Sequence, residues 1–166
     1  MYMVNPMKKE KIISILEEVM DPEIPVLSIT DLGILRTVEV EGDDIRVTIT
    51  PTYSGCPAME TIQQDIRNVL AKNGFGNVSI NQVLSPAWTS DWMSTAGKEK
   101  LEAYGIAPPS LSDFCALATF VNDEPDHCPL CKSKNIEMIS RFGSTSCKAL
   151  YRCLDCREPF DYFKCH

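Results

Sequence analysis

Histidine is almost absent from the chain, which holds only His127 and His166. Residues 1–126 therefore contain no imidazole that could serve as the base of a cysteine–histidine hydrolase, and that function is disfavoured. The chain also lacks the Glu-x-x-His pair of a di-iron bundle, the Gly-x-Gly-x-x-Gly loop of a dinucleotide site and the cysteine spacing of a plant-type ferredoxin. These absences argue against redox catalysis by this chain alone.

Long apolar runs are missing as well. Charged residues interrupt the first twenty positions, so no secretory signal is predicted, and Cys115–Val121 is too short to cross a bilayer. We therefore expect a cytoplasmic protein without a membrane partner. In a reducing compartment its eight cysteines are better interpreted as metal ligands or reactive thiols than as disulfides.

Positive charge is scarce, and the two parts of the chain share it unequally. Residues 1–126 hold 9 Lys and Arg against 19 Asp and Glu, a net charge of -10, whereas residues 127–166 hold 7 against 4, a net charge of +3. The total of -7 does not favour binding to nucleic acid. The change of sign indicates that the C-terminal segment is a separate module.

The first part of the chain alternates helical and strand patterns. Apolar residues at helical spacing predict helices, alternating apolar residues predict strands, and Pro, Asp and Gly mark the ends. The predicted order is helix 8–20, strands 34–40 and 45–50, helix 58–73, strand 77–84 and helix 95–104. This pattern predicts a small α+β domain of α-β-β-α-β-α order with a mixed sheet over residues 1–107, and a linker over 108–126.

The C-terminal module, residues 127–166, carries two cysteine pairs. Cys128 and Cys131 are separated by two residues, as are Cys153 and Cys156, and 21 residues lie between the pairs. This spacing predicts a tetrahedral site in a zinc ribbon, in which four thiolates leave no open position and the zinc is structural. The runs IEMISRF, KALYRC and FDYF predict the strands of the ribbon. Rubredoxin-like iron in the same thiolates, or three disulfides among the six cysteines of the module, are the alternatives.

Three further soft ligands, Cys147, Cys165 and His166, lie in the same module. The simpler interpretation is that these cysteines are small buried residues. The other is a transient second site for iron or a cluster.

One cysteine of the first domain stands at a predicted helix start. Cys56 lies between Gly55 and Pro57, where the helix dipole is expected to lower its thiol pKa. A buried, inert cysteine is the alternative. Asp21, Glu23 and Asp31 are interpreted either as carboxylates that support iron binding or, preferably, as turn formers and helix caps.

The motifs DPEIP, DLG and TYSGCP, at Asp21–Pro25, Asp31–Gly33 and Thr52–Pro57, resemble those of the SufT-type iron–sulfur assembly family. The resemblance covers residues 8–107. It implies that Cys56 is the reactive residue and that Asp21, Glu23 and Asp31 line the same region. A transient iron or iron–sulfur cluster is then the expected cargo.

The tail FGSTSCKALYRCLDCREPFDYFKCH, at Phe142–His166, extends the resemblance. Behind such a domain, it is similar to the D-subunit family of the bacterial phenylacetyl-CoA epoxidase systems. This implies an accessory protein of ring 1,2-epoxidation in aerobic phenylacetate degradation.

In such a system the chain would mature the iron or iron–sulfur centre of the reductase or oxygenase component, with iron–sulfur scaffold proteins as further partners. The alternative is a non-catalytic structural or regulatory subunit of the epoxidase complex. Homodimerisation of the first domain is compatible with either role.

Overall fold

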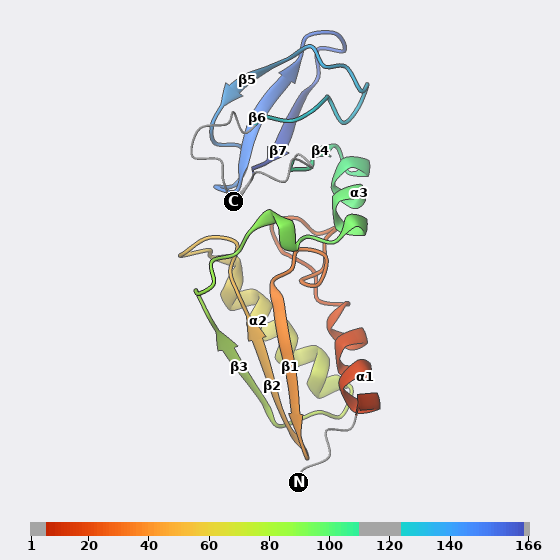
Figure 1. Ribbon diagram of the computed structural model, residues 1–166, viewed down its shortest axis with the longest axis vertical. Helices are drawn as coiled ribbons and strands as arrows, with labels where there is room; N and C mark the ends of the chain where they lie inside the picture. The colour runs from red at the N-terminus through yellow and green to blue at the C-terminus, as the bar shows by residue number, and fades with distance from the viewer. Residues whose placement is uncertain (1–5, 110–123, 165–166) are drawn as a thin grey trace. The chain divides into compact units, whose positions relative to one another are not determined.

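A computed structural model describes residues 6–109 and 124–164 of the chain (Figure 1). The chain forms two compact units, Met1–Trp88 and Thr89–His166, called the N-terminal and C-terminal units below. Within the described residues, no helix has the length and apolar character needed to cross a membrane.

The N-terminal unit contains a three-stranded mixed sheet, as predicted. Strands β1 (Leu35–Glu41) and β2 (Asp44–Ile49) form an antiparallel hairpin, and β3 (Val78–Gln82) lies parallel to β2. Helix α2 (Ala58–Lys72) provides the crossover that a parallel pair requires. The predicted α+β class is therefore confirmed.

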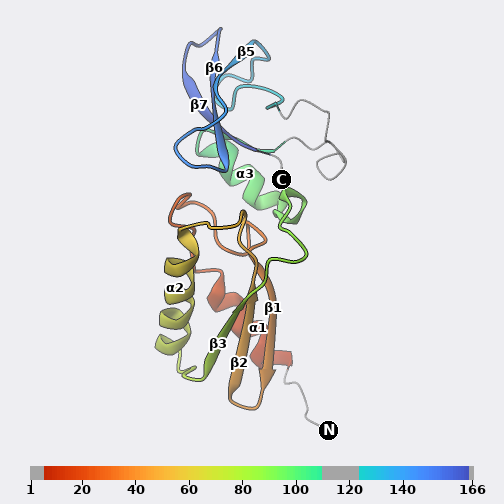
Figure 2. The same cartoon turned by 90° about the vertical axis from the view of Figure 1, so that its left-hand side faces the viewer.

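Helices α1 (Pro6–Leu16) and α2 contact each other and pack against the edge strands β1 and β3 (Figure 2). Burial alternates along β2 and along β1 from Val38 onward, so this part of the hairpin has one apolar and one more polar face. The fully buried core residues include Ile12, Leu16, Val47, Ile62 and Ile66. Two loops that carry the sequence motifs are attached to this core: one lies between α1 and β1, and the other between β2 and α2.

Helix α1 ends earlier than predicted. It stops at Leu16 instead of continuing to Met20. The physical reason is a competing backbone pairing: Met20 forms an antiparallel bridge with Ser28, and Ile29 N donates to Val19 O at 3.0 Å. The loop after the helix is consequently closed at its base by backbone hydrogen bonds.

The C-terminal unit begins with η1 (Ser90–Trp92) and α3 (Thr95–Ala103). A four-stranded sheet follows in the order β4-β7-β6-β5, formed by Ile106–Ala107, Pro159–Phe163, Lys148–Cys153 and Ile136–Ser140. Tyr151 lies at the centre of its core, stacked 6.0 Å from Phe160 and edge-on 5.8 Å from Tyr162. The apolar face of the sheet thereby packs beside the cysteine pairs.

The boundary between the units lies at 88/89, whereas the sequence predicts a domain end at 107. Helix α3 contacts β4, and β4 pairs in parallel with β7, so both elements belong to the C-terminal unit. Two-residue strands carry no periodicity that a sequence pattern could reveal. Most of the predicted linker, residues 110–123, lies outside the described residues.

Candidate functional site

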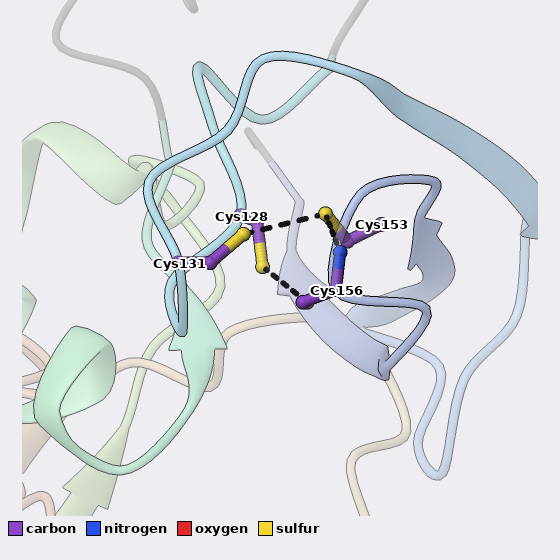
Figure 3. Close-up of side chains that lie close together, drawn as sticks. All are labelled: Cys128, Cys131, Cys153 and Cys156. Atoms are coloured by element: carbon purple, nitrogen blue, oxygen red, sulfur yellow. Dashed lines mark hydrogen bonds between the residues drawn. The ribbon is translucent and has the colours of Figure 1, made fainter.

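Four cysteines of the C-terminal unit converge on one point (Figure 3). Cys128 and Cys131 precede β5, Cys153 ends β6, and Cys156 precedes β7. Their four sulfur atoms lie within 4.8 Å of one another. The sulfurs of Cys131 and Cys153 are 3.5 Å apart, and those of Cys128 and Cys156 are 3.9 Å apart.

These distances fit a tetrahedral metal site. With metal–sulfur bonds of about 2.3 Å, the sulfurs of a tetrahedral site are about 3.8 Å apart. The observed pairs lie close to that value, and the ligand set is all-thiolate. The four cysteines therefore form a metal-binding group, as the spacing predicts.

The two cysteine turns have matching backbones. Lys132 and Arg157, each directly after the second cysteine of its pair, adopt left-handed conformations with φ of 64° and 65°. Cys128 N donates to Ser133 O at 2.8 Å, and Cys153 N donates to Glu158 O at 3.0 Å. The repeated turn orients both cysteines of a pair toward the same point.

Asp155 connects the two turns. Its carboxylate accepts hydrogen bonds from Ser133 Oγ at 2.5 Å and Asn135 Nδ2 at 2.9 Å, and these bonds lower its pKa. Leu154 N also donates to Asn135 O at 2.8 Å. The turn of Cys153 and Cys156 is thereby fixed to the segment that follows Cys131.

The crowded thiols do not ionise equally. The backbone N–H of Cys156 donates to Cys153 Sγ at 3.5 Å and lowers the pKa of Cys153 to about 7. The N–H of Glu158 favours the thiolate of Cys156, but burial and the neighbouring sulfurs raise the pKa of Cys156 to about 12. Metal binding at such a site displaces the remaining thiol protons.

Helix α3 contacts the first cysteine turn through Glu102. The carboxylate oxygen Oε1 pairs with Lys132 Nζ and with His127 Nε2, the latter at 2.7 Å. These two partners lower the pKa of Glu102. His127 is therefore the chain neighbour of the metal-binding residue Cys128, and its imidazole contacts α3 through Glu102.

Cys147 does not belong to this cluster. It is 3% exposed, and its sulfur lies 3.0 Å from Thr145 Oγ1. Cys165 and His166, which the second-site hypothesis requires, lie outside the described residues. That hypothesis stays a prediction.

Cys56 lies in a tight turn that leads into α2. Gly55 has a φ of +80° and no atom near its missing side chain, and Pro57 is the N-cap of the helix. Cys56 is half-buried, and its N–H donates to Tyr53 O at 3.3 Å. The turn leaves this thiol partly accessible at the start of the helix.

Two of the predicted acidic residues organise the loop between Val19 and Ile34. Asp21 Oδ1 accepts from the backbone of Glu23 at 2.7 Å and of Ile24 at 2.8 Å. Asp31 Oδ2 accepts from Ser28 N at 3.2 Å, and Ser28 Oγ accepts from Asp31 N at 3.0 Å. These are contacts of turn-forming carboxylates.

In the described part of the chain, only the four cysteines bring three or more metal-ligand atoms together; Cys56 and the acidic residues do not. Glu23 and Asp21 are nevertheless close enough for their charges to affect Cys56. Of the predicted acidic residues, these two act on the thiol electrostatically.

The predicted lowering of the Cys56 pKa is wrong. Burial raises the pKa of this thiol above its ordinary value of 9.0, and the charges of Glu23 and Asp21 raise it further. The N–H of Ala58 and the side chain of Tyr53 act in the opposite direction, but their effect is smaller. The thiol therefore stays protonated at neutral pH.

This shift predicts the pH dependence of Cys56 alkylation. Only the thiolate reacts with iodoacetamide, so the rate should keep rising above pH 9.0. Glu23→Gln removes a negative charge, lowers the pKa and increases the rate at pH 8. Mass spectrometry of the peptide containing Cys56 measures both rates. A plateau below pH 9.0, or no effect of Glu23→Gln, would contradict the prediction.

Two family models match the chain. The model "Iron-sulfur cluster assembly protein" matches residues 9–81, and "PaaD zinc beta ribbon domain" matches residues 116–164. The first range contains Cys56 and the loop of Asp21 and Asp31, and the second contains all four clustered cysteines. The C-terminal cysteine site is thus that of a zinc ribbon domain.

Related proteins match either the whole chain or its N-terminal part. An Escherichia coli (strain K12) protein, named as the D subunit of a "Putative 1,2-phenylacetyl-CoA epoxidase", is 47% identical over 98% of this chain and 96% of its own length. A Porphyromonas gingivalis protein named "Fe-S protein maturation auxiliary factor" is 40% identical over 52% of this chain and 83% of its own length.

A solved structure shares the fold of the N-terminal part. The crystal structure of a domain of unknown function (DUF59) from Bacillus anthracis is 31% identical, with a TM-score of 0.55. The match covers 58% of this chain and 97% of that chain.

Proposed function

Because this chain belongs to the D-subunit family of 1,2-phenylacetyl-CoA epoxidases, we propose that it is a cytoplasmic factor that helps mature another component. The client is the reductase or the oxygenase of the epoxidase system, and the cargo is iron or an iron–sulfur cluster. The family supports an accessory role. The match of residues 9–81 to iron–sulfur assembly proteins is the observation that carries the more specific proposal.

Cys56 is the residue that receives the cargo in this proposal. Its thiol is half-buried at an open turn, beside Gly55, where no side chain obstructs the approach of another molecule. Transfer is a ligand exchange without oxidation or reduction: a bond between iron and the donor breaks, a bond between iron and Cys56 sulfur forms, and the thiol proton passes to solvent. Iron–sulfur scaffold proteins are the chemical class that supplies such cargo.

The carboxylates of Asp21 and Glu23 support this exchange electrostatically. Their negative charges raise the pKa of free Cys56, whereas an approaching iron cation is attracted by the same charges and favours the thiolate. The free thiol therefore stays protonated and unreactive, and it loses its proton when the iron cation binds. Asp31 is assigned a supporting role through the loop that it closes with Ser28.

The cysteine cluster of the C-terminal unit has a separate role. Cys128, Cys131, Cys153 and Cys156 would hold a zinc ion, and four thiolates around one tetrahedral ion leave no position for a substrate. When bound, the ion would supply structural stability rather than Lewis-acid chemistry. In this proposal the folded ribbon recognises the client component.

The test compares the reductase and oxygenase components from cells that make the native chain or Cys56→Ala. We expect iron to fall in one of these components, because the variant lacks the thiol that receives the cargo. In a component that holds a cluster, acid-labile sulfide should fall with it. Elemental analysis and sulfide assay of the purified components provide the measurement.

Ser54→Ala, at an exposed position of the same turn, is the matched control and should leave loading unchanged. Zinc in the accessory chain should be equal in all samples. Full loading of both components with Cys56→Ala would overturn the maturation role and favour a structural or regulatory subunit, which would co-purify in fixed proportion.

A further inference from the structure

One carboxylate of α3 contacts both ends of the first cysteine turn. Oε1 of Glu102 lies 2.7 Å from Nε2 of His127 and also pairs with Nζ of Lys132. His127 stands directly before the first cysteine of the pair, Cys128, and Lys132 stands directly after the second. A single oxygen atom of Glu102 therefore joins the two residues that enclose the first cysteine pair.

The backbone of this turn needs such support. Lys132 has a φ of 64°, in the left-handed region, where a residue other than glycine persists only if its surroundings hold it there. Two backbone hydrogen bonds close the turn, from Lys132 N to Cys128 O at 2.9 Å and from Cys128 N to Ser133 O at 2.8 Å. The contact of Glu102 with the side chain of Lys132 further favours this conformation.

The carboxylate of Glu102 reaches the turn from a well-packed element. Its side chain is only 29% exposed, and the preceding residue of α3, Leu101, is fully buried. After the helix, β4 pairs with β7, and Ala107 of β4 packs in one cluster with Cys128 and Cys153. Helix α3 is therefore attached to the same core as the cysteines of the metal site.

The second cysteine turn is supported in a different way. It has the same backbone as the first, with a φ of 65° at Arg157, but its carboxylate, Asp155, lies within the turn itself. Asp155 binds Ser133 and Asn135, whereas both contacts of Glu102 go to the first turn. The second turn is therefore an internal reference for any effect of Glu102.

We propose that Glu102 is a positioning residue of the metal site, which holds the first cysteine turn in its metal-binding conformation. Because folding and metal binding are coupled in small ribbons, a contact made in the folded turn contributes to metal affinity. Glu102 lies outside both ranges that the family models match, residues 9–81 and 116–164. Metal retention then depends on a helix that the sequence pattern assigns to the first domain. This role is independent of the maturation function proposed for Cys56.

The charge of Glu102 has an effect of opposite sign, which the experiment must separate from the contacts. Four thiolates around a divalent cation carry a net negative charge, so a nearby carboxylate disfavours them. Glu99, an exposed residue one turn earlier in α3, lines a surface hollow together with Leu130 and Lys132 of the first cysteine turn. Glu99→Gln therefore removes the same charge from the same region but keeps the contacts of Glu102.

Amide hydrogen exchange of the full chain, saturated with zinc and followed by NMR, tests the proposal. The N–H groups of Cys128 and Lys132 report on the first turn. The N–H of Cys153, which donates to Glu158 O at 3.0 Å, reports on the second. In Glu102→Gln we expect exchange in the first turn to rise about fivefold, the upper range for partly exposed ion pairs, with no change in the second. Zinc affinity, measured by competition with a chelator, should fall by about the same factor.

Two further variants complete the experiment. Glu99→Gln should exchange like the native chain and bind zinc at least as tightly. In a Lys132→Met background, Glu102→Gln should have a smaller effect than it has alone, because Glu102 acts on the turn partly through Lys132. Unchanged exchange in Glu102→Gln, an equal rise in both turns, or the same effect from Glu99→Gln would each overturn the proposal. An equal rise would identify a general loss of stability, and an effect of Glu99→Gln would identify charge alone.

Discussion

Replacing Cys153 with serine is expected to abolish metal binding and unfold the C-terminal unit while the N-terminal unit stays folded. The four cysteines provide the whole ligand set, so three remaining thiolates cannot close the tetrahedron. Structural zinc in small domains contributes about 10–16 kcal/mol of apparent binding free energy at neutral pH. The sheet of the C-terminal unit packs its core directly on Cys128 and Cys153, so its folding depends on that contribution.

Metal analysis and amide NMR spectra measure this effect. We expect no bound metal and collapsed chemical-shift dispersion for Thr89–His166, with the resonances of Met1–Trp88 unchanged. Cys147→Ser is the matched control because Cys147 is buried in the same unit but lies outside the cluster. A folded C-terminal unit in Cys153→Ser without metal would show that the ribbon does not need the ion.

A second large effect is expected from Asp161→Ala. Lys148 is only 4% exposed, and its Nζ atom lies 3.5 Å from Asp161 Oδ2. Ser144 Oγ donates to the same oxygen at 2.9 Å. Removing the carboxylate leaves a buried ammonium without its counter-ion, which typically costs about 3–5 kcal/mol.

Thermal unfolding of the C-terminal unit should therefore begin at a lower temperature in Asp161→Ala. Lys148→Met is the matched variant, and its effect should be smaller because the remaining carboxylate is partly exposed and keeps the Ser144 hydrogen bond. Equal stability of Asp161→Ala and the native chain would contradict a structural role for this ion pair.

The helices and strands that periodicity predicts are present in the structure, although α1 ends before the predicted residue. The predicted strand 148–153 coincides with β6, and helix 58–73 ends one residue beyond α2. The spacing of Cys128, Cys131, Cys153 and Cys156 also predicts their convergence, because a two-residue gap allows both thiols of a pair to bind one ion.

Features that depend on tertiary contacts could not be predicted in this way. The family resemblance implies that Asp21 and Glu23 lie near Cys56, but the direction of the thiol pKa depends on burial and on these charges, which only the folded structure brings together. Likewise, the assignment of α3 to the C-terminal unit depends on the short strand β4 and on the contacts of Glu102 with His127 and Lys132. Neither leaves a periodic signal in the sequence.

The left-handed conformations of Lys132 and Arg157 link the metal to the protein surface. Glycine adopts such a backbone most easily, so these two side chains keep their places only while the cysteine turns are intact. Loss of the ion would release both backbones from these conformations and weaken the ion pair of Lys132 with Glu102. By thermodynamic reciprocity, a molecule that binds Arg157 better in the metal-loaded state must tighten metal binding by the same factor. The ribbon would then retain its ion longest while it is engaged with a partner.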